Sequence, residues 1–252
     1  MPDLRPAQLI EFFHLAFLQV LQARLDQSTY VLKGGANLRY FFESVRYSED
    51  IDLDAGGIET WALAERVDGV INSPALARLL RSGGLTVSEF TKPKQTETTQ
   101  RWKVALTAGG QRDPVSTKIE FSGRNRGDTR YLLEPVPGAV VAPFALRAPS
   151  VMHYSAEAAV EQKIEALAGR SETQARDVFD LDLILRRQPP VPIVPDTLVR
   201  EQAAARALDL PYDAFRDQVL PFLDADVAEL YADAGSWAQI QGHVVERLLE
   251  AA

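Results

Sequence analysis

The segment 31-VLKGGANLRYFFESVRYSEDIDLD-54 joins a short apolar run, a pair of glycines, a helical segment and three aspartates at alternate positions. Successive side chains of a strand point to opposite faces of a sheet. We therefore expect Asp50, Asp52 and Asp54 on one face, with Ile51 and Leu53 entering the core. The order strand, glycine turn, helix and strand is the first indication of both fold and function.

The alternate carboxylates and the glycine turn together indicate a particular chemistry. Unpaired carboxylates at neighbouring positions of one face repel each other unless a cation bridges them. Mg²⁺ binds few protein oxygens and leaves its other positions to water or substrate phosphates. The backbone N–H groups of a glycine turn that starts a helix favour phosphate. The segment predicts a metal–triphosphate site, although a solvent-exposed acidic strand after an ordinary helix start remains the alternative.

The composition excludes several classes of protein. The 252 residues contain no cysteine and three histidines, which excludes disulfides, zinc fingers and cysteine nucleophiles and disfavours a histidine-built metal site. No apolar run approaches the roughly 20 residues that a membrane span needs. The apolar N-terminal segment carries polar side chains and lacks a basic start, so it predicts an amphipathic helix and not a signal peptide. We expect no membrane association and a cytoplasmic location.

Charge divides the chain into two parts. The net charge is −8, but residues 1–150 have a net charge of +1 and residues 151–252 one of −9. Within the first part, residues 92–130 carry nine Lys or Arg against four Asp or Glu. This excess predicts a local basic surface, with a solvated face of a β-sheet as the alternative.

Secondary-structure signals change at the same point as the charge. Helical and strand patterns alternate up to about residue 150, with several strands after Gly83 and Gly84, whereas nearly everything from Ser155 onward is helical. We therefore predict an α+β fold, in which a mixed-sheet domain over residues 1–150 precedes a helical domain over residues 151–252.

The opening segment also resembles a known family. The order Gly-Gly, helix and Asp-Ile-Asp-Leu resembles the nucleotidyltransferase superfamily related to DNA polymerase beta. More narrowly, KGGANLR at residues 33–39 and RYSEDIDL at residues 46–53 resemble the AbiEii/AbiGii toxin-type nucleotidyltransferases, toxins of bacterial abortive-infection and toxin–antitoxin operons. The family often has Gly-Ser where this chain has Gly34-Gly35, so Ser48 is the candidate to supply the missing hydroxyl.

Three further motifs follow in the order of the family. TKIEFS at residues 117–122 resembles the second motif, EAAVEQKIEALAGR at residues 157–170 the third, and RDVFDLDLIL at residues 176–185 the fourth. The resemblance covers about residues 30–185. It implies a nucleotidyltransferase domain followed by a helical domain that contributes to the site.

The resemblance implies roles for single residues. Asp50 and Asp52 would bind two Mg²⁺ ions, with Mn²⁺ as an alternative metal, and Glu120 would add a third carboxylate from a neighbouring strand. From the helical domain, Lys163 would reach the phosphates and Asp177 would join the catalytic residues. The predicted nucleotide-binding residues are Lys33, Gly34, Gly35, Arg39 and Ser48, and the predicted supporting residues are Lys118, Arg176 and Asp180.

Without the resemblance, the same positions have ordinary explanations. Lys118 and Glu120 would be a solvated pair on an edge strand, and Arg39 would pair with Glu43 one helical turn later. Arg176 and Asp180 share a helical face, which predicts a surface pair. Lys163 would be exposed at the boundary of an apolar helical stripe, and residues 171–174 resemble a capping box that starts the next helix.

The implied activity is transfer of a nucleotide from an NTP to RNA, with the tRNA 3′ end as acceptor, so that translation stops. A cognate antitoxin encoded nearby is implied, but a stable complex between toxin and antitoxin is not implied. Two alternatives stay open. One is nucleotidyl transfer to a small molecule or a protein side chain, and the other is a non-catalytic binding partner that retains the fold.

Overall fold

The computed structural model describes residues 4–109, 113–123, 130–187 and 192–250. It divides into two compact units, a sheet unit (Met1–Phe41 and Tyr47–Tyr154) and a helical unit (Phe42–Arg46 and Ser155–Ala252). The sequence placed a boundary at residue 150. The structure continues the sheet to Tyr154 and assigns the short segment Phe42–Arg46 to the helical unit.

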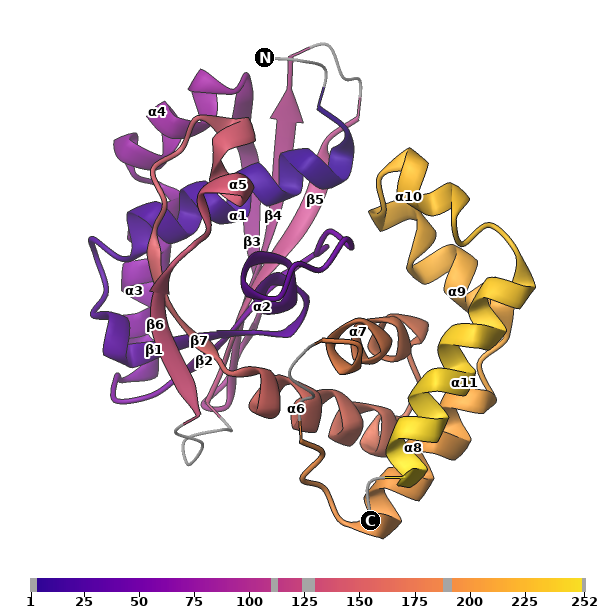
Figure 1. Cartoon of the computed structure of the whole chain (residues 1–252). Helices are drawn as coiled ribbons and strands as arrows, with labels where there is room; N and C mark the ends of the chain where they lie inside the picture. Colours follow the sequence, from indigo (N-terminus) through magenta and orange to yellow (C-terminus); the bar gives the residue numbers. More distant parts are fainter. Residues whose placement is uncertain (1–3, 110–112, 124–129, 188–191, 251–252) are drawn as a thin grey trace. The chain divides into compact units, whose positions relative to one another are not determined.

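The sheet unit is built on a mixed seven-stranded sheet in the order β3-β4-β5-β2-β1-β7-β6 (Figure 1). The pairs β2–β5 and β1–β7 are parallel and the other pairs are antiparallel, so the predicted mixed sheet is confirmed. The strands are β1 Tyr30–Lys33, β2 Ile51–Ala55, β3 Leu85–Gln95, β4 Thr99–Ala108, β5 Val115–Ser122, β6 Tyr131–Pro135 and β7 Ser150–Tyr154.

Helices cover one face of this sheet. Helix α1 packs against two further helices and against β5, and it buries its phenylalanines completely. From the sheet, Trp102, Val104 and Ile119 enter the same core with no exposed surface. The helices of this unit are α1 Pro6–Leu21, α2 Gly34–Phe41, α3 Thr60–Ile71, α4 Pro74–Ser82 and α5 Gly138–Val141, with 3₁₀ turns at Gln27–Thr29 and Ala142–Phe144.

Strand β2 is the central strand of the sheet. Ile51 and Leu53 have no exposed surface and enter the core, as the alternation predicts, while Asp52 points to the opposite face. Helix α2 contacts β1 and β2. The glycine pair and the aspartates of the opening segment are therefore neighbours in space.

The helical unit packs around an aromatic centre in which Phe215 and Trp237 stack with their rings 4.7 Å apart. Its helices are α6 Ala156–Gly169, α7 Ala175–Leu185, α8 Thr197–Leu208, α9 Tyr212–Gln218, α10 Ala225–Glu229 and α11 Ala234–Glu250, with a 3₁₀ turn at Leu220–Phe222. Among the described residues, no helix combines the length and the apolar character that crossing a membrane requires.

The predicted capping box at residues 171–174 is wrong. Helix α7 begins at Ala175, and no side chain at the N-cap position Gln174 accepts a hydrogen bond from the helix. Instead, the backbone N–H of Ala175 donates to the Oε1 atom of Gln218, 2.8 Å away on α9. The unpaired N–H group at the start of this helix thus finds its acceptor on a residue more than forty positions later, which the local sequence does not reveal.

Candidate active site

Five charged residues form one row across the face of the sheet opposite the helical core. The register aligns Lys94 of β3 with Arg101 of β4, Arg101 with Glu120 of β5, Glu120 with Asp52 of β2, and Asp52 with Lys33 of β1. Directly paired residues on one face lie about 5 Å apart. The predicted neighbours Asp52 and Glu120 are therefore side by side, and cations extend the row at both ends.

Gly34 brings the start of helix α2 against the carboxylate of Asp52. Its φ angle is +67°, a left-handed conformation that other residues adopt with strain. A Cβ atom built on Gly34 would lie 3.0 Å from the Oδ2 atom of Asp52. Glycine is thus required here both for the backbone turn and for the close approach of the carboxylate.

Asp50 is held at the start of β2 by β5. The backbone N–H of Lys118 donates to its Oδ1 atom at 3.2 Å, and the ammonium group of Lys118 lies 2.7 Å from Oδ2. Lys118 therefore pairs with Asp50 and not with Glu120, and β5 is not an edge strand. The hydroxyl of Ser48 donates to the backbone carbonyl of Asp50 at 2.7 Å, so here it shapes the loop.

Behind Asp50, a hydrogen-bonded chain connects the core to the loop. The hydroxyl of Thr117 donates to the carbonyl of Glu49 at 2.8 Å and lies 2.7 Å from the Nε2 atom of His14. Because Thr117 uses its proton for Glu49, it accepts from Nε2–H of His14, whose Nδ1 atom has no hydrogen-bond partner among the described residues. Burial lowers the pKa of this fully buried histidine to about 3, so it is neutral at physiological pH.

The other two acids on this face are also paired. Arg101 donates to the Oε2 atom of Glu120 at 2.6 Å. Asp54 forms an ion pair with Lys33 and accepts a 2.8 Å hydrogen bond from the hydroxyl of Tyr154. Neither Arg101 nor Tyr154 was predicted as a site residue, because their partners are set by strand register and by the fold of distant segments.

Arg39 is fixed by helix α1 and not by its own helix. Its guanidinium donates to the carboxylate of Glu11 at 2.7 Å and lies 4.1 Å from the ring centre of Tyr47. The alternative pairing with Glu43 is therefore wrong. Arg39 remains a predicted phosphate ligand, although in this structure it ties α2 to α1.

A buried ion network in the helical unit contains the other predicted residues. The ammonium group of Lys163 donates to Asp177 at 2.8 Å and to Asp180 at 2.6 Å. Arg46 donates two hydrogen bonds to Asp180, at 2.9 and 2.7 Å, and the guanidinium of Arg170 lies 3.1 Å from Asp177. Lys163 and Asp177 are thus neighbours, as the resemblance implies.

Two ordinary explanations for this region are wrong. Asp180 has no exposed surface and pairs with Arg46 and Lys163, so it does not form a surface pair with Arg176. Lys163 is 9% exposed, so it is not a solvated lysine. Burial alone would raise the pKa of Asp180, but the charges and hydrogen bonds of Arg46 and Lys163 outweigh it and hold this pKa well below its usual range.

The donor set on the sheet suits a metal that takes few protein ligands. Among the described residues, no group of three or more His, Asp or Glu side chains is close enough to hold an ion unaided. Asp50 and Glu120 instead bind the cations Lys118 and Arg101. Mg²⁺ commonly uses one or two carboxylates plus substrate phosphates, which Asp50 and Asp52 beside the start of α2 are able to supply.

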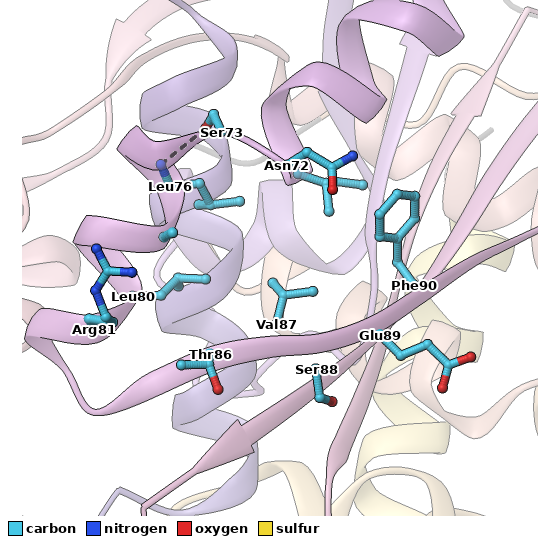
Figure 2. Close-up of a pocket in the computed structure, with 12 residues that line it drawn as sticks. Asn72, Ser73, Leu76, Leu80, Arg81, Thr86, Val87, Ser88, Glu89 and Phe90 are labelled. Atoms are coloured by element: carbon cyan, nitrogen blue, oxygen red, sulfur yellow. Dashed lines mark hydrogen bonds between the residues drawn. The ribbon is translucent and has the colours of Figure 1, made fainter.

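A separate cavity of about 480 Å³ lies between α4 and strand β3 (Figure 2). Leu76 and Leu80 from the helix and Val87 and Phe90 from the strand form its apolar part, and Arg81 and Glu89 lie at its edges. It shares no lining residue with the charged row, and no sequence motif predicted it.

Comparisons with known proteins agree with this geometry. The chain resembles two solved structures: JHP933 from Helicobacter pylori (18% identity, 96% of this chain and 93% of that chain, TM-score 0.59) and MenT4, a nucleotidyltransferase toxin from Mycobacterium tuberculosis (17%, 96% and 82%, TM-score 0.57). No curated protein sequence matches the chain. The model of the nucleotidyl transferase AbiEii toxins of type IV toxin–antitoxin systems matches residues 16–248. The chain therefore belongs to the AbiEii family of nucleotidyltransferase toxins.

Proposed function

We propose that this toxin transfers a nucleoside monophosphate from an NTP to an RNA acceptor, the 3′ end of tRNA, and so blocks translation. The hydroxyl of the RNA forms the new bond to the α-phosphate, and pyrophosphate leaves. The observation that carries the proposal is the position of the Asp52 carboxylate beside Gly34, where a Cβ atom would lie only 3.0 Å from Oδ2. It brings a helix N-terminus, which favours phosphate, against a carboxylate that has Glu120 beside it in register.

The residues of the sheet unit divide the task between them. The backbone N–H groups at Gly34 and Gly35 bind the triphosphate, and Asp50 and Asp52 are the ligands for Mg²⁺ or Mn²⁺, with Glu120 as a third candidate. When bound, the metal supplies charge stabilisation and a lowered pKa for the attacking hydroxyl. Lys118 and Arg101 neutralise Asp50 and Glu120 when no other cation does so.

An RNA acceptor is supported by the charge of the face that bears the row. Lys94 and Lys103 lie on this face on neighbouring strands and have no carboxylate partner among the described residues, while Arg101 and Lys118 pair with Glu120 and Asp50. The whole chain has a net charge of −8. A protein that is acidic overall binds RNA through such a local concentration of cations, which release counterions from phosphates. The affinity for RNA is accordingly expected to fall steeply with salt.

Lys163 and Asp177 are proposed as further active-site residues on the strength of the family motifs. Their mutual ion pair is consistent with a lysine that neutralises phosphate charge while its own position is fixed. Membership of a type IV toxin–antitoxin family also supports a cognate antitoxin, encoded nearby, that counteracts the toxin.

The test is a labelling experiment with purified full-length protein. The protein is incubated with Mg²⁺, total bacterial RNA and each labelled NTP in turn, beside Asp52→Asn. We expect label in the tRNA band from the wild type and a loss of roughly a hundredfold or more in the variant. Label on protein or on a small molecule, with none on RNA, would mean that the acceptor is a protein or a small molecule and not RNA. Absence of any label from a folded protein would indicate a non-catalytic role.

A further inference from the structure

A β-bulge in the edge strand β3 redirects one lysine towards the charged row. Thr91 pairs with Lys103 and Lys94 pairs with Arg101, so three steps along β3 oppose two steps along β4. In a regular strand Lys92 and Lys94 would share a face, whereas the extra residue places them on opposite faces. Pro93 lies between them and is compatible with this position because an edge strand lacks one set of ladder bonds.

The contacts of the two lysines confirm that they point to opposite sides. Lys92 forms a 2.9 Å ion pair with Asp68 of α3, which also accepts a hydrogen bond from the indole of Trp102 on the covered face. Lys94 instead lines a cavity of about 370 Å³ on the other face. The residues that line this cavity are Lys33, Asp54, Lys94, Thr99, Arg101, Glu120 and Ser122.

The charges in this cavity leave Lys94 available for a ligand. Lys33 is paired with Asp54, and Arg101 is paired with Glu120. Among the residues that the structure describes, Lys94 has no carboxylate partner. The cavity therefore carries one uncompensated positive charge and shares Glu120 with the proposed metal site, a combination that suits a phosphate group and not a neutral ligand.

The direction of the row indicates which phosphate this is. The cavity extends along the row from Lys33 of β1 to Lys94 of β3. Its Lys94 end lies three strands from Asp52, roughly 14 Å at the usual strand spacing, and is the end away from the start of α2. In phosphoryl transfer the attacking and leaving oxygens lie roughly in line. If the triphosphate lies at α2, the acceptor approaches from the side of β5, β4 and β3.

We propose that the cavity around Lys94 binds a phosphodiester of the RNA acceptor close to its reacting 3′ end. This inference rests on the proposed function, because it assigns a role to the acceptor of that reaction. The bulge at Pro93 is then the feature that recruits an edge-strand lysine to the site. Lys94 is a binding residue and takes no part in the transfer of the nucleotide.

Lys94→Ala and Lys92→Ala form a matched pair, with the same change two positions apart on one exposed strand. The dissociation constant for unfractionated tRNA and for a short single-stranded oligoribonucleotide is measured by fluorescence anisotropy over a range of salt, without NTP. We expect Lys94→Ala to raise the dissociation constant for RNA about five- to tenfold. The slope of log affinity against log salt concentration should decrease in magnitude by about one, and Lys94→Arg should restore both quantities. We expect Lys92→Ala to bind RNA with the affinity of the wild type. We expect the KM for NTP of Lys94→Ala to equal that of the wild type.

Three outcomes would overturn the inference alone, and a fourth would overturn the proposed function with it. Equal losses in both alanine variants would show a general effect of charge. A raised KM for NTP with unchanged RNA affinity in Lys94→Ala would assign the lysine to the triphosphate. If tRNA is labelled in an Asp52-dependent manner but Lys94→Ala binds RNA as tightly as the wild type, the Lys94 site is rejected and the proposed function stands. If the wild type neither labels nor binds RNA, the proposed function itself fails, and this inference fails with it.

Discussion

At the scale of single residues, Gly34 and Gly57 separate two effects of the same substitution. Both glycines have positive φ angles, +67° and +70°. A Cβ atom on Gly34 would meet Asp52 at 3.0 Å, whereas one on Gly57 would meet nothing within 4 Å. Alanine would therefore strain the backbone at both positions, but of these two positions only Gly34 is one where it would also displace the carboxylate of Asp52.

We predict that Gly34→Ala and Gly57→Ala each lower the free energy of unfolding by about 1–2 kcal/mol, the cost of a left-handed conformation for alanine. Nucleotidyl transfer should fall strongly in Gly34→Ala and stay near the wild-type rate in Gly57→Ala. Denaturant unfolding and the labelling assay measure the two effects. Equal activity in the two variants would mean that Asp52 tolerates displacement.

His14 predicts a pH dependence of stability. Its pKa is lowered from 6.5 to about 3 in the folded protein, so the unfolded state binds the proton more readily between these values. Stability is therefore full above pH 6.5 and falls with decreasing pH, by about 1.4 kcal/mol per unit from this residue. In His14→Gln, which retains a donor for Thr117, the decrease between pH 6.5 and 4 should be shallower. Parallel curves for the two proteins would contradict this assignment.

The alternating aspartates were predictable as a set because strand periodicity is a local property. Their partners were not predictable. Lys118 pairs with Asp50 and Arg101 with Glu120 because the register of three strands brings them together. Register depends on the whole sheet, and a single sequence offers no direct signal for it.

At the scale of elements, the segment Phe42–Arg46 is part of the connection between α2 and β2 and belongs to the helical unit. Arg46 forms a bidentate pair with Asp180, and their side chains are 4% and 0% exposed. Asp180 also binds Lys163. One buried carboxylate thus fixes both the end of this segment and the lysine of the third motif.

We predict that Asp180→Asn lowers the free energy of unfolding by about 3–5 kcal/mol, because it removes a buried carboxylate that pairs with both Arg46 and Lys163. The control is Asp213→Asn, which removes an acid that pairs with Arg216 at a largely exposed site and should change stability by less than about 1 kcal/mol. Chemical denaturation measures both. If both variants lost similar, small amounts of unfolding free energy, the ion pair of Lys163 with Asp177 would be sufficient to stabilise the buried lysine.

Elements with strong periodicity were predictable, and exceptions arose where one element depends on another. The sequence predicts the order of β1, α2 and β2, which the structure has. It does not predict the bulge at Pro93, which appears only against the pairing with β4, or the start of α7, which uses Gln218 of α9. The bulge at Pro93, on which the proposed acceptor site depends, is one of these exceptions.

At the scale of the whole molecule, the change in charge and composition near residue 150 predicted two units because each has its own core and its own secondary structure. The sequence did not reveal that Phe42–Arg46 belongs with the helices, since only the buried partner of Arg46 shows it. Family motifs in both units predict that the whole chain serves one reaction. This is a prediction that ligand binding tests directly.

Binding of a metal–nucleotide complex should stabilise the folded chain by mass action. With Mg²⁺ and a non-hydrolysable NTP analogue at about 100 times the dissociation constant, we predict a gain of about 2.7 kcal/mol, seen as a higher Tm. EDTA should remove the gain, because the phosphates then lack the cation that joins them to Asp50 and Asp52. Asp52→Asn should show no shift, while Asp213→Asn, altered at an exposed ion pair, should shift like the wild type. A full shift in EDTA, or in Asp52→Asn, would mean that the nucleotide binds without the metal that these aspartates are proposed to hold.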